Sequence, residues 1–316
     1  MYSTSNMAFL LQSLLFASLS IFHSTNPAKA SEANIVVSIY PLYLAVQEAF
    51  SNQVNVEVLL PARVSPHHYA LKPSEMKRLK TADLFVWVGP ELENFLVKPV
   101  QQQLSADRSV FSVLDWLQTN KPDGLLRVNQ SRSESHSRFA DSPRTANAQN
   151  KTLTDPHIWL SQELVISAIF GIQQRLAIIY PDKASSLQQS AEIFAERLRQ
   201  QPSHSPLRDK KFISYHNGFD YLAKDAGFSI IDVMTTNTDL RPGAKPLVSI
   251  RNRVEQDSIC LITEPQFSSG VVTKLVENGS IEVIEVDPTG GDYTRYSEFL
   301  SNTLAKLGRC GTSQAH

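Results

Sequence analysis

Histidines are the residues of this 316-residue chain whose type and spacing could bind a metal ion. Four of the eight lie in the N-terminal segment 1–30, a polar loop, a polar joint and the C-terminus: His23, His136, His204 and His316. The other four are His67, His68, His157 and His216. Three imidazole nitrogens and one carboxylate oxygen form a good tetrahedral shell for Zn²⁺. The residue types therefore suggest a zinc site of His67, His157 and His216, with Asp287 as the fourth ligand.

Each of these residues also has a simpler explanation on its own. A single histidine at the end of a strand is often a surface residue or a hydrogen-bonded core group. Asp287 precedes Pro288 and can simply form a turn. The sequence contains no H-E-x-x-H and no C-x-x-C, so it lacks local metal motifs. The hypothesis therefore depends on whether the fold brings the four side chains together.

Strands alternating with helices are predicted in both halves of the chain. Runs rich in β-branched and aromatic residues predict strands at 35–40, 54–60, 84–88 and 109–113, and again at 212–215, 230–234, 259–263 and 281–286. Helical or turn-rich segments separate these strands, and this alternation is typical of a parallel sheet covered on both faces. The predicted fold class is therefore α/β, with two lobes that each contain a parallel sheet flanked by helices.

The predicted strands place the candidate ligands at one kind of position. His67 follows the strand at 54–60, His216 directly follows the strand at 212–215, and Asp287 directly follows the strand at 281–286. In open parallel sheets, ligands bind beyond the carboxyl ends of the strands. His157 lies at the entry to the helical stretch that leads from the first lobe to the second. We therefore expect the four side chains to meet between the lobes.

Four segments make up the predicted domain organisation. Residues 1–30 are predicted to be a signal peptide, because an apolar run precedes Ala28-Lys29-Ala30; a buried N-terminal helix is the alternative. An N-terminal α/β lobe covers 31–180 and includes a mobile polar loop at 129–154. A connecting helix at 181–203, long enough to run beside both lobes, leads to a C-terminal α/β lobe at 204–316.

Charge and composition restrict the classes of function. Thirty basic and thirty-one acidic residues give a net charge of −1, which argues against a nucleic-acid-binding protein. After residue 30, no stretch is long and apolar enough to cross a membrane. Export into an oxidising compartment makes a disulfide the simplest interpretation of the two cysteines, Cys260 and Cys310. Two buried free thiols are the alternative.

Five segments carry a resemblance to a known family. They are residues 58–93, which contain Pro66-His67-His68, and residues 155–161, 215–219, 264–267 and 287–288. In this order they resemble the ZnuA family, the periplasmic zinc-binding components of bacterial ABC importers. The resemblance implies two α/β lobes joined by a long rigid helix, with the metal between them. It also implies that His67, His157 and His216 are ligands and that Asp287 or a water molecule is the fourth.

Three departures from the family pattern affect the site. Pro66 stands where some relatives have a glutamate ligand, and His68 stands where relatives often have an aspartate. Neighbouring residues of an extended chain point apart, so we assign His68 to the surroundings of the site or to the surface. In the zinc branch the loop between the first two ligands is typically rich in histidine and acidic residues. Here the loop at 129–154 retains one histidine, His136, and two acidic residues, Glu134 and Asp141, among three arginines. We therefore expect no metal-scavenging role for that loop.

The predicted function is that of an exported carrier in the periplasm. It binds Zn²⁺ as its transported ligand and delivers it, as a monomer and without enzymatic activity, to a zinc ABC permease in the inner membrane. The same fold carrying Mn²⁺ or Fe²⁺ is one alternative, although His216 argues against it because relatives for those metals tend to have a carboxylate there. A secreted zinc hydrolase with Glu264 as general base is the second, and a surface adhesin of related fold is the third.

Overall fold

The computed structural model describes residues 33–311 except 68, 104–108, 130–151, 202–206, 236–258, 268–269 and 271–280. The predicted signal peptide, His68 and most of the predicted loop at 129–154 therefore lie outside the described residues. The boundaries predicted between the lobes stay predictions.

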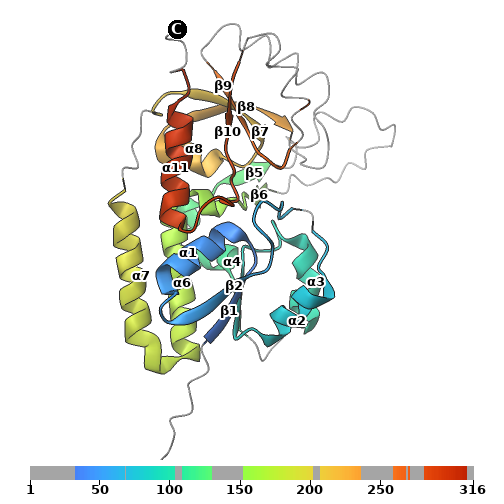
Figure 1. Ribbon diagram of the computed structural model, residues 1–316, viewed down its shortest axis with the longest axis vertical. Coiled ribbons are helices and arrows are strands. Elements are labelled where there is room, and N and C mark those ends of the chain that lie inside the picture. Colours follow the sequence, from blue (N-terminus) through green and yellow to red (C-terminus); the bar gives the residue numbers. More distant parts are fainter. Residues whose placement is uncertain are drawn as a thin grey trace, which may run out of the picture. The chain divides into compact units, whose positions relative to one another are not determined.

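Two four-stranded sheets, each with all strands parallel, form the framework (Figure 1). The first contains β1 (Ala33–Val37), β2 (Val54–Val58), β3 (Leu84–Trp87) and β4 (Ser109–Ser112), in the order β2-β1-β3-β4. The second contains β7 (Lys211–His216), β8 (Ser229–Thr235), β9 (Cys260–Thr263) and β10 (Glu282–Glu285), in the order β10-β9-β7-β8. The predicted α/β class with two parallel sheets is confirmed.

The sequence forms parallel strands because their side chains are apolar on both faces. All four residues of β3 and all four of β9 are buried, as expected for strands covered from both sides. A small antiparallel pair, β5 (Arg127–Asn129) and β6 (Thr152–Thr154), lies outside the two main sheets. Each main sheet delivers the carboxyl ends of its strands to a single edge, and such an edge is where ligands bind.

Helices cover the two sheets. The α-helices are α1 (Tyr40–Phe50), α2 (Pro73–Thr81), α3 (Val97–Gln103), α4 (Val113–Asn120), α6 (Gln162–Ile179), α7 (Ala184–Arg199), α8 (Asp220–Ala226) and α11 (Tyr296–Gly308). Short 3-10 helices are η1 (Asn94–Leu96), η2 (Pro122–Gly124), η3 (Ile158–Leu160) and η4 (Pro181–Lys183). Pro41 occupies the first turn of α1, where its missing N–H leaves no helical hydrogen bond unmade.

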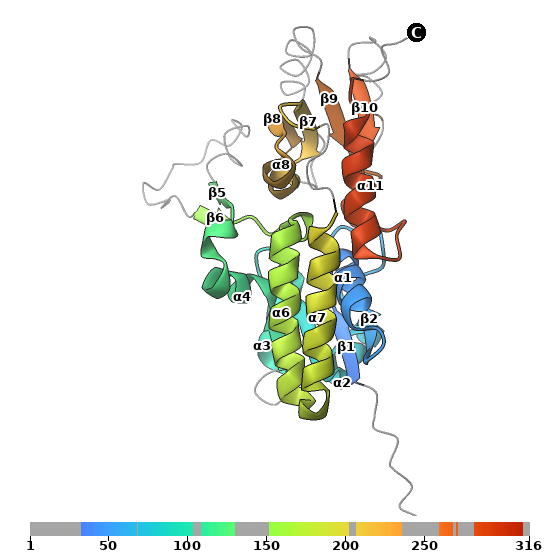
Figure 2. The ribbon, with the colours of Figure 1, turned by 90° about the vertical axis from the view of Figure 1, so that its left-hand side faces the viewer.

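Helices α6 and α7 form the connection between the two sheets. They lie side by side (Figures 1 and 2), and α7 also packs on α1. The chain turns back between them at η4, because proline cannot continue the hydrogen-bond ladder of α6. A helix running beside both lobes is predicted at 181–203. This stretch contains α7, which is antiparallel to α6.

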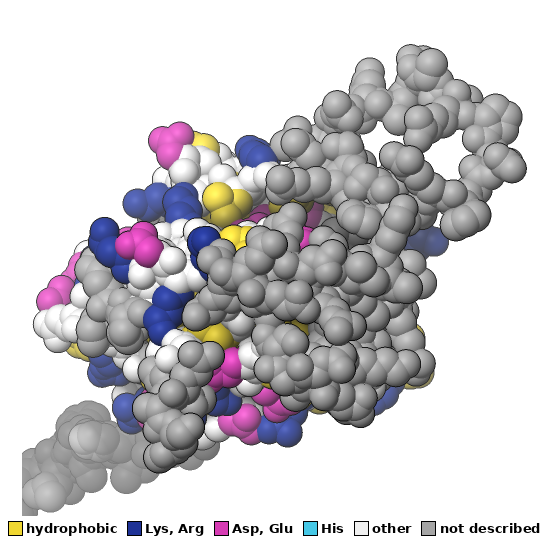
Figure 3. All heavy atoms as spheres, turned by 90° about the horizontal axis from the view of Figure 1, so that it is seen from above, with side chains coloured by type: hydrophobic (Ala, Val, Ile, Leu, Met, Phe, Trp, Pro, Cys, Tyr) yellow, Lys and Arg dark blue, Asp and Glu magenta, His cyan; other side chains and the backbone are white. Residues whose placement is uncertain are grey.

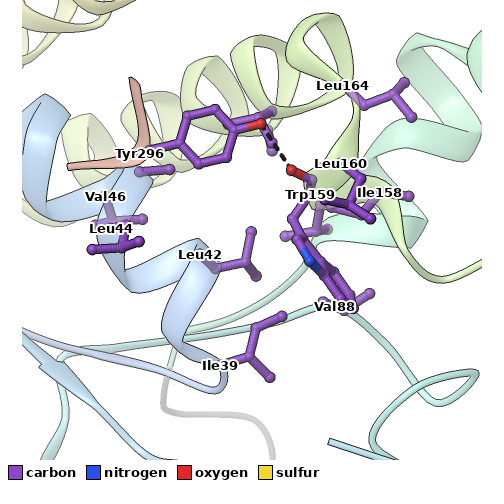
Figure 4. Packing of buried hydrophobic residues seen from close by; sticks show 14 of the residues in the cluster. Ile39, Leu42, Leu44, Val46, Val88, Ile158, Trp159, Leu160, Leu164 and Tyr296 are labelled. Atoms are coloured by element: carbon purple, nitrogen blue, oxygen red, sulfur yellow. Dashed lines mark hydrogen bonds between the residues drawn. The ribbon is translucent and has the colours of Figure 1, made fainter. Parts of the chain in front are cut away.

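A single cluster of buried apolar residues contains side chains that flank both sheets. Trp159 belongs to it and lies near Leu42 and Val88 from the first lobe (Figure 4). The Tyr296 hydroxyl donates a hydrogen bond to the carbonyl oxygen of Trp159 at 2.8 Å. The Trp159 ring in turn donates from Nε1 to the Pro288 carbonyl oxygen at 2.8 Å. The segments around η3, α11 and residue 288 are therefore held together by packing and by buried hydrogen bonds.

Charged side chains of both signs are interspersed on the face shown in Figure 3, as far as its described residues are visible. Within the described parts of the chain, none of the helices combines the length and the apolar character that a bilayer-spanning segment requires.

The two cysteines form the predicted disulfide. Cys260, the first residue of β9, is bonded to Cys310, which follows α11, and both residues are buried. The bond links positions 50 residues apart, so it restricts the unfolded chain as well as tying α11 to the second sheet.

We expect the double substitution Cys260→Ala and Cys310→Ala to lower the free energy of unfolding by about 2–4 kcal/mol, because it removes this restriction on the unfolded state. Urea unfolding of the two proteins measures the difference. Reduced wild type is the control and should unfold near the midpoint of the double variant. Equal midpoints for oxidised wild type and double variant would show that the bond contributes nothing.

Glu93 is a fully buried acidic residue at the carboxyl end of the first sheet. Its carboxyl group accepts hydrogen bonds from the Ser38 hydroxyl and from the backbone N–H groups of Val88 and Gly89. Burial raises the pKa of Glu93 to about 7, although these hydrogen bonds act in the opposite direction. The group therefore ties the ends of β1 and β3 together but does so at an electrostatic cost when it is ionised.

The raised pKa of Glu93 predicts a loss of stability as the pH rises through about 7. A carboxyl group with a higher pKa in the folded chain than in the unfolded chain stabilises fully below its ordinary value of 4.5. That contribution, about 3 kcal/mol, disappears as the pH passes the folded value. Urea unfolding of wild type and Glu93→Gln should show their difference in unfolding free energy changing by this amount from about pH 4 to pH 8. A pH-independent difference would contradict the prediction.

Candidate metal centre

Three imidazole rings converge on one point. Nε2 of His157 lies 3.2 Å from Nε2 of His67 and 3.3 Å from Nε2 of His216. One ligand nitrogen from each of the three rings lies within 4.8 Å of the other two. Nitrogens bound tetrahedrally to zinc at 2.0–2.1 Å stand about 3.3 Å apart. The observed separations therefore match the edges of a zinc coordination tetrahedron.

Each ring comes from a different element. His216 is the last residue of β7, His157 directly precedes η3, and His67 lies in the segment between β2 and α2. His157 and His216 are only 5% and 6% exposed, whereas His67 is half-buried. Three of the four residues predicted from the sequence are thus brought together, and His67 is the one nearest to solvent.

Two buried carboxyl groups orient two of the rings. Nδ1 of His157 lies 2.8 Å from Oδ1 of Asp155, and Nδ1 of His216 contacts Oε1 of Glu264. Asp155 and Glu264 are each 1% exposed. A carboxylate on Nδ1 holds the proton there, so the lone pair of Nε2 faces the other rings. This arrangement presents two neutral imidazoles to a cation and sets two acidic groups behind them.

Further hydrogen bonds fix both carboxyl groups. The backbone N–H of His157 donates to Asp155 Oδ1 at 3.0 Å. The side-chain amide of Gln266 donates to Glu264 Oε2 at 2.8 Å. When ionised, the two carboxylates supply two negative charges, which balance a divalent cation held by three neutral rings. A metal ion therefore fits the charge of the site as well as its geometry.

Aromatic rings and one glycine shape the walls of the site. Trp159 packs against the His157 ring with centroids 5.2 Å apart, while Phe219 and Phe267 lie beside His216 at 6.2 and 5.5 Å. Gly218 lies under His216, where a Cβ atom would come within 2.5 Å of the ring. Any larger residue at 218 would push the ring out of place. The apolar walls exclude water and so strengthen the attraction between the ring nitrogens and a cation.

Asp287 is not part of the three-ring group. Its Oδ1 accepts hydrogen bonds from the Thr289 N–H at 2.8 Å and the Thr289 hydroxyl at 2.6 Å. Its Oδ2 accepts one from the Gly291 N–H at 3.0 Å. Both carboxylate oxygens thus accept hydrogen bonds within the loop that follows β10. This is the turn-forming role that the neighbouring Pro288 suggests.

Sequence reasoning missed the supporting residues Asp155 and Gly218 and gave Glu264 a different role. The position of Glu264 is a signal for its role. Glu264 directly follows β9, His216 is the last residue of β7, and these two strands are neighbours in the sheet. Asp155 lies two residues before His157, so its carboxylate can accept a hydrogen bond from the backbone N–H of His157. The sequence suggests Glu264 only as the base of a hydrolase, whereas in the structure Glu264 contacts His216.

Comparisons with known proteins agree on one group. The family model described as "Zinc-uptake complex component A periplasmic" matches residues 35–310. The high-affinity zinc uptake system protein ZnuA of Yersinia pestis is 30% identical over 298 residues, which cover 90% of this chain and 93% of that protein. The protein of the same name from Haemophilus ducreyi is 27% identical over 299 residues, covering 89% and 94% of the two chains.

Solved structures share the fold. A crystal structure of ZnuA superposes with a TM-score of 0.72 at 24% identity, covering 88% of this chain and 99% of that one. The periplasmic zinc-binding protein TroA from Treponema pallidum gives a TM-score of 0.67 at 17% identity, with coverages of 88% and 99%. Zn(II)-bound AdcA from Streptococcus pneumoniae gives 0.67 at 20% identity, covering 88% of this chain and 57% of that one.

We expect Glu264→Gln to weaken Zn²⁺ binding by about 10- to 100-fold, because a neutral amide replaces the charged acceptor that holds the Nδ1 proton of His216. Asp155→Asn should act in the same direction through His157. Competition with a coloured chelator measures the affinity of each purified variant. Glu48→Gln is the matched control, because the Glu48 carboxylate accepts hydrogen bonds from Ser297 and lies outside the three-ring group. Binding by Glu264→Gln as tight as that of Glu48→Gln would contradict the assigned role.

Proposed function

Because the chain belongs to the ZnuA family of zinc-uptake components, we propose that it is a carrier that binds Zn²⁺ and delivers it to an ABC-type importer. The ion is the transported substrate, and His67, His157 and His216 are its ligands. The observation that carries the proposal is the convergence of three imidazole rings, with Nε2 of His157 at 3.2 and 3.3 Å from Nε2 of the other two. Homologues named as zinc-uptake and zinc-binding proteins support the choice of ion.

The chemistry of the ligands favours zinc over the alternative cargoes. Imidazole nitrogen suits Zn²⁺, whereas Mn²⁺ prefers shells rich in carboxylate and water oxygens. The three-ring group contains no carboxylate ligand among the described residues. The fourth position falls to water or to Asp287, and for Asp287 to reach the ion its loop would first have to release the carboxylate.

A carrier fits the site better than a hydrolase does. A zinc hydrolase needs a free carboxylate or similar base beside the metal-bound water. Glu264, the residue considered for that role, is already engaged by His216 and Gln266. The family also consists of solute-binding components. We therefore assign the buried acidic groups to holding the ligands in place.

The place of action follows from the family and the N-terminal sequence. The family model names its members periplasmic. Residues 1–30 have the apolar run and the Ala28-Lys29-Ala30 pattern of a cleaved signal peptide. We propose that the chain is exported, that the signal is removed after Ala30, and that the mature monomer meets a zinc permease at the inner membrane.

Calorimetric titration of the chelator-stripped, signal-free protein tests the binding step. We expect one tight Zn²⁺ site, much weaker Mn²⁺ binding, and a loss of zinc affinity of at least about 100-fold in His216→Ala, because a three-nitrogen site loses one ligand. His136→Ala, in the predicted polar loop, is the matched control and should bind like wild type. Tight zinc binding that survives His216→Ala would place the ion elsewhere and refute the ligand set.

A further inference from the structure

Two loops meet beside the three rings. One is the segment 61–67, which follows β2 and carries His67; the other is the segment 287–293, which follows β10. The backbone N–H of Arg63 donates to the Thr289 hydroxyl oxygen at 3.1 Å. The Arg63 side chain pairs with Asp292, and its Nε lies 3.8 Å from Oδ2 of Asp287. Arg63 thus reaches three residues of the second loop.

The second loop is itself anchored to other parts of the chain. The Pro288 carbonyl accepts from Trp159 Nε1, two residues after His157. The carbonyl of Tyr293 accepts from the hydroxyl of Tyr40, in α1, at 3.1 Å. The loop 287–293 therefore provides a fixed surface to which the segment carrying His67 can be tied.

Local geometry indicates that Arg63 is held by these contacts. Its φ of 65° lies in the left-handed region, which residues other than glycine adopt only where the surroundings enforce it. Gly291 lies against the Arg63 side chain, and a Cβ at 291 would come within 2.6 Å of Arg63 Cγ. The two loops are thus fitted to each other at this point.

Solvent reaches one part of this junction. The side chains of Arg63 and Asp292 are 53% and 49% exposed, whereas Asp287 is only 4% exposed. An exposed ion pair is weakened by salt, while the buried hydrogen bonds of Asp287 are not. His67, half-buried, is also the most accessible of the three rings. The segment that holds the most accessible ligand is therefore secured in part by an ion pair that is about half exposed.

We infer that Arg63 is a positioning residue that latches the loop carrying His67 to the loop after β10 and thereby slows the release of Zn²⁺. This inference rests on the proposed function. Release of an ion from three ligands proceeds by stepwise loss of ligands, and the ring that solvent reaches most easily, His67, leaves first. With the latch closed, His67 rebinds before the ion escapes. With the Arg63 pairs broken, the loop can move away and the ion leaves faster.

The test is the rate at which zinc-loaded protein gives up Zn²⁺ to an excess of chelator in a stopped-flow instrument. We expect Arg63→Gln to release zinc roughly fivefold faster than wild type, because exposed charge pairs have effects of this size. Arg63→Lys keeps the charge and should recover part of the difference. The wild-type rate should rise with KCl concentration, and the Arg63→Gln rate should rise less, since its pairs are already absent.

Arg199→Gln is the matched control, because Arg199 forms an equally exposed ion pair with Glu163 at 3.4 Å, between α7 and α6. It should release zinc at the wild-type rate. Asp292→Asn tests the latch from the other loop and should also speed release. If wild type binds no zinc at the histidines, the proposed function fails and the latch fails with it. If wild type binds zinc but Arg63→Gln and Asp292→Asn match it in rate and salt dependence, only the latch is overturned.

Discussion

Three ring nitrogens held 3.2 and 3.3 Å apart are the constraint on which the rest of the site depends. With their Nδ1 protons bound to carboxylates, the facing Nε2 atoms of His157 and His216 are both acceptors and repel each other until a cation lies between them. The rings can keep this arrangement only if they are fixed from behind. Asp155 and Glu264 supply that support. The acidic groups therefore serve two ends, since they orient the rings and balance the charge of the ion.

The fixed points lie on elements that are far apart in the sequence, so the site depends on the packing of those elements. His216 is placed by β7, and His157 is placed by η3, whose Trp159 is buried in the shared core. Trp159 accepts a hydrogen bond from Tyr296 (Figure 4) and donates one to Pro288, and these bonds join that core to both ends of the stretch between β10 and α11. A displacement of one element by about 1 Å would exceed the roughly 0.2 Å by which metal–ligand distances can vary.

Sequence patterns predicted the parts of this structure that depend on short-range chemistry. Buried β-branched runs identify parallel strands, and strand ends locate His67 and His216. Pro181 breaks the helical stretch for a local reason, but the direction of α7 after it depends on which apolar faces pack, including that of α1. The pairing of Glu264 with His216 required the knowledge that β7 and β9 are neighbours. Strand order is set by the whole sheet and cannot be read from either strand.

The position of Asp287 shows why a carboxylate at the end of a strand need not be a ligand. Three hydrogen bonds from Thr289 and Gly291 hold it, and a hydrogen bond to a charged group contributes about 1.5–3 kcal/mol. Binding to the ion would require giving up at least one of these bonds as well as the attraction of Arg63. A water molecule needs no such exchange. We therefore expect the three histidines to determine the preference for zinc, while the fourth position stays open to the solvent molecule that accompanies the ion in and out.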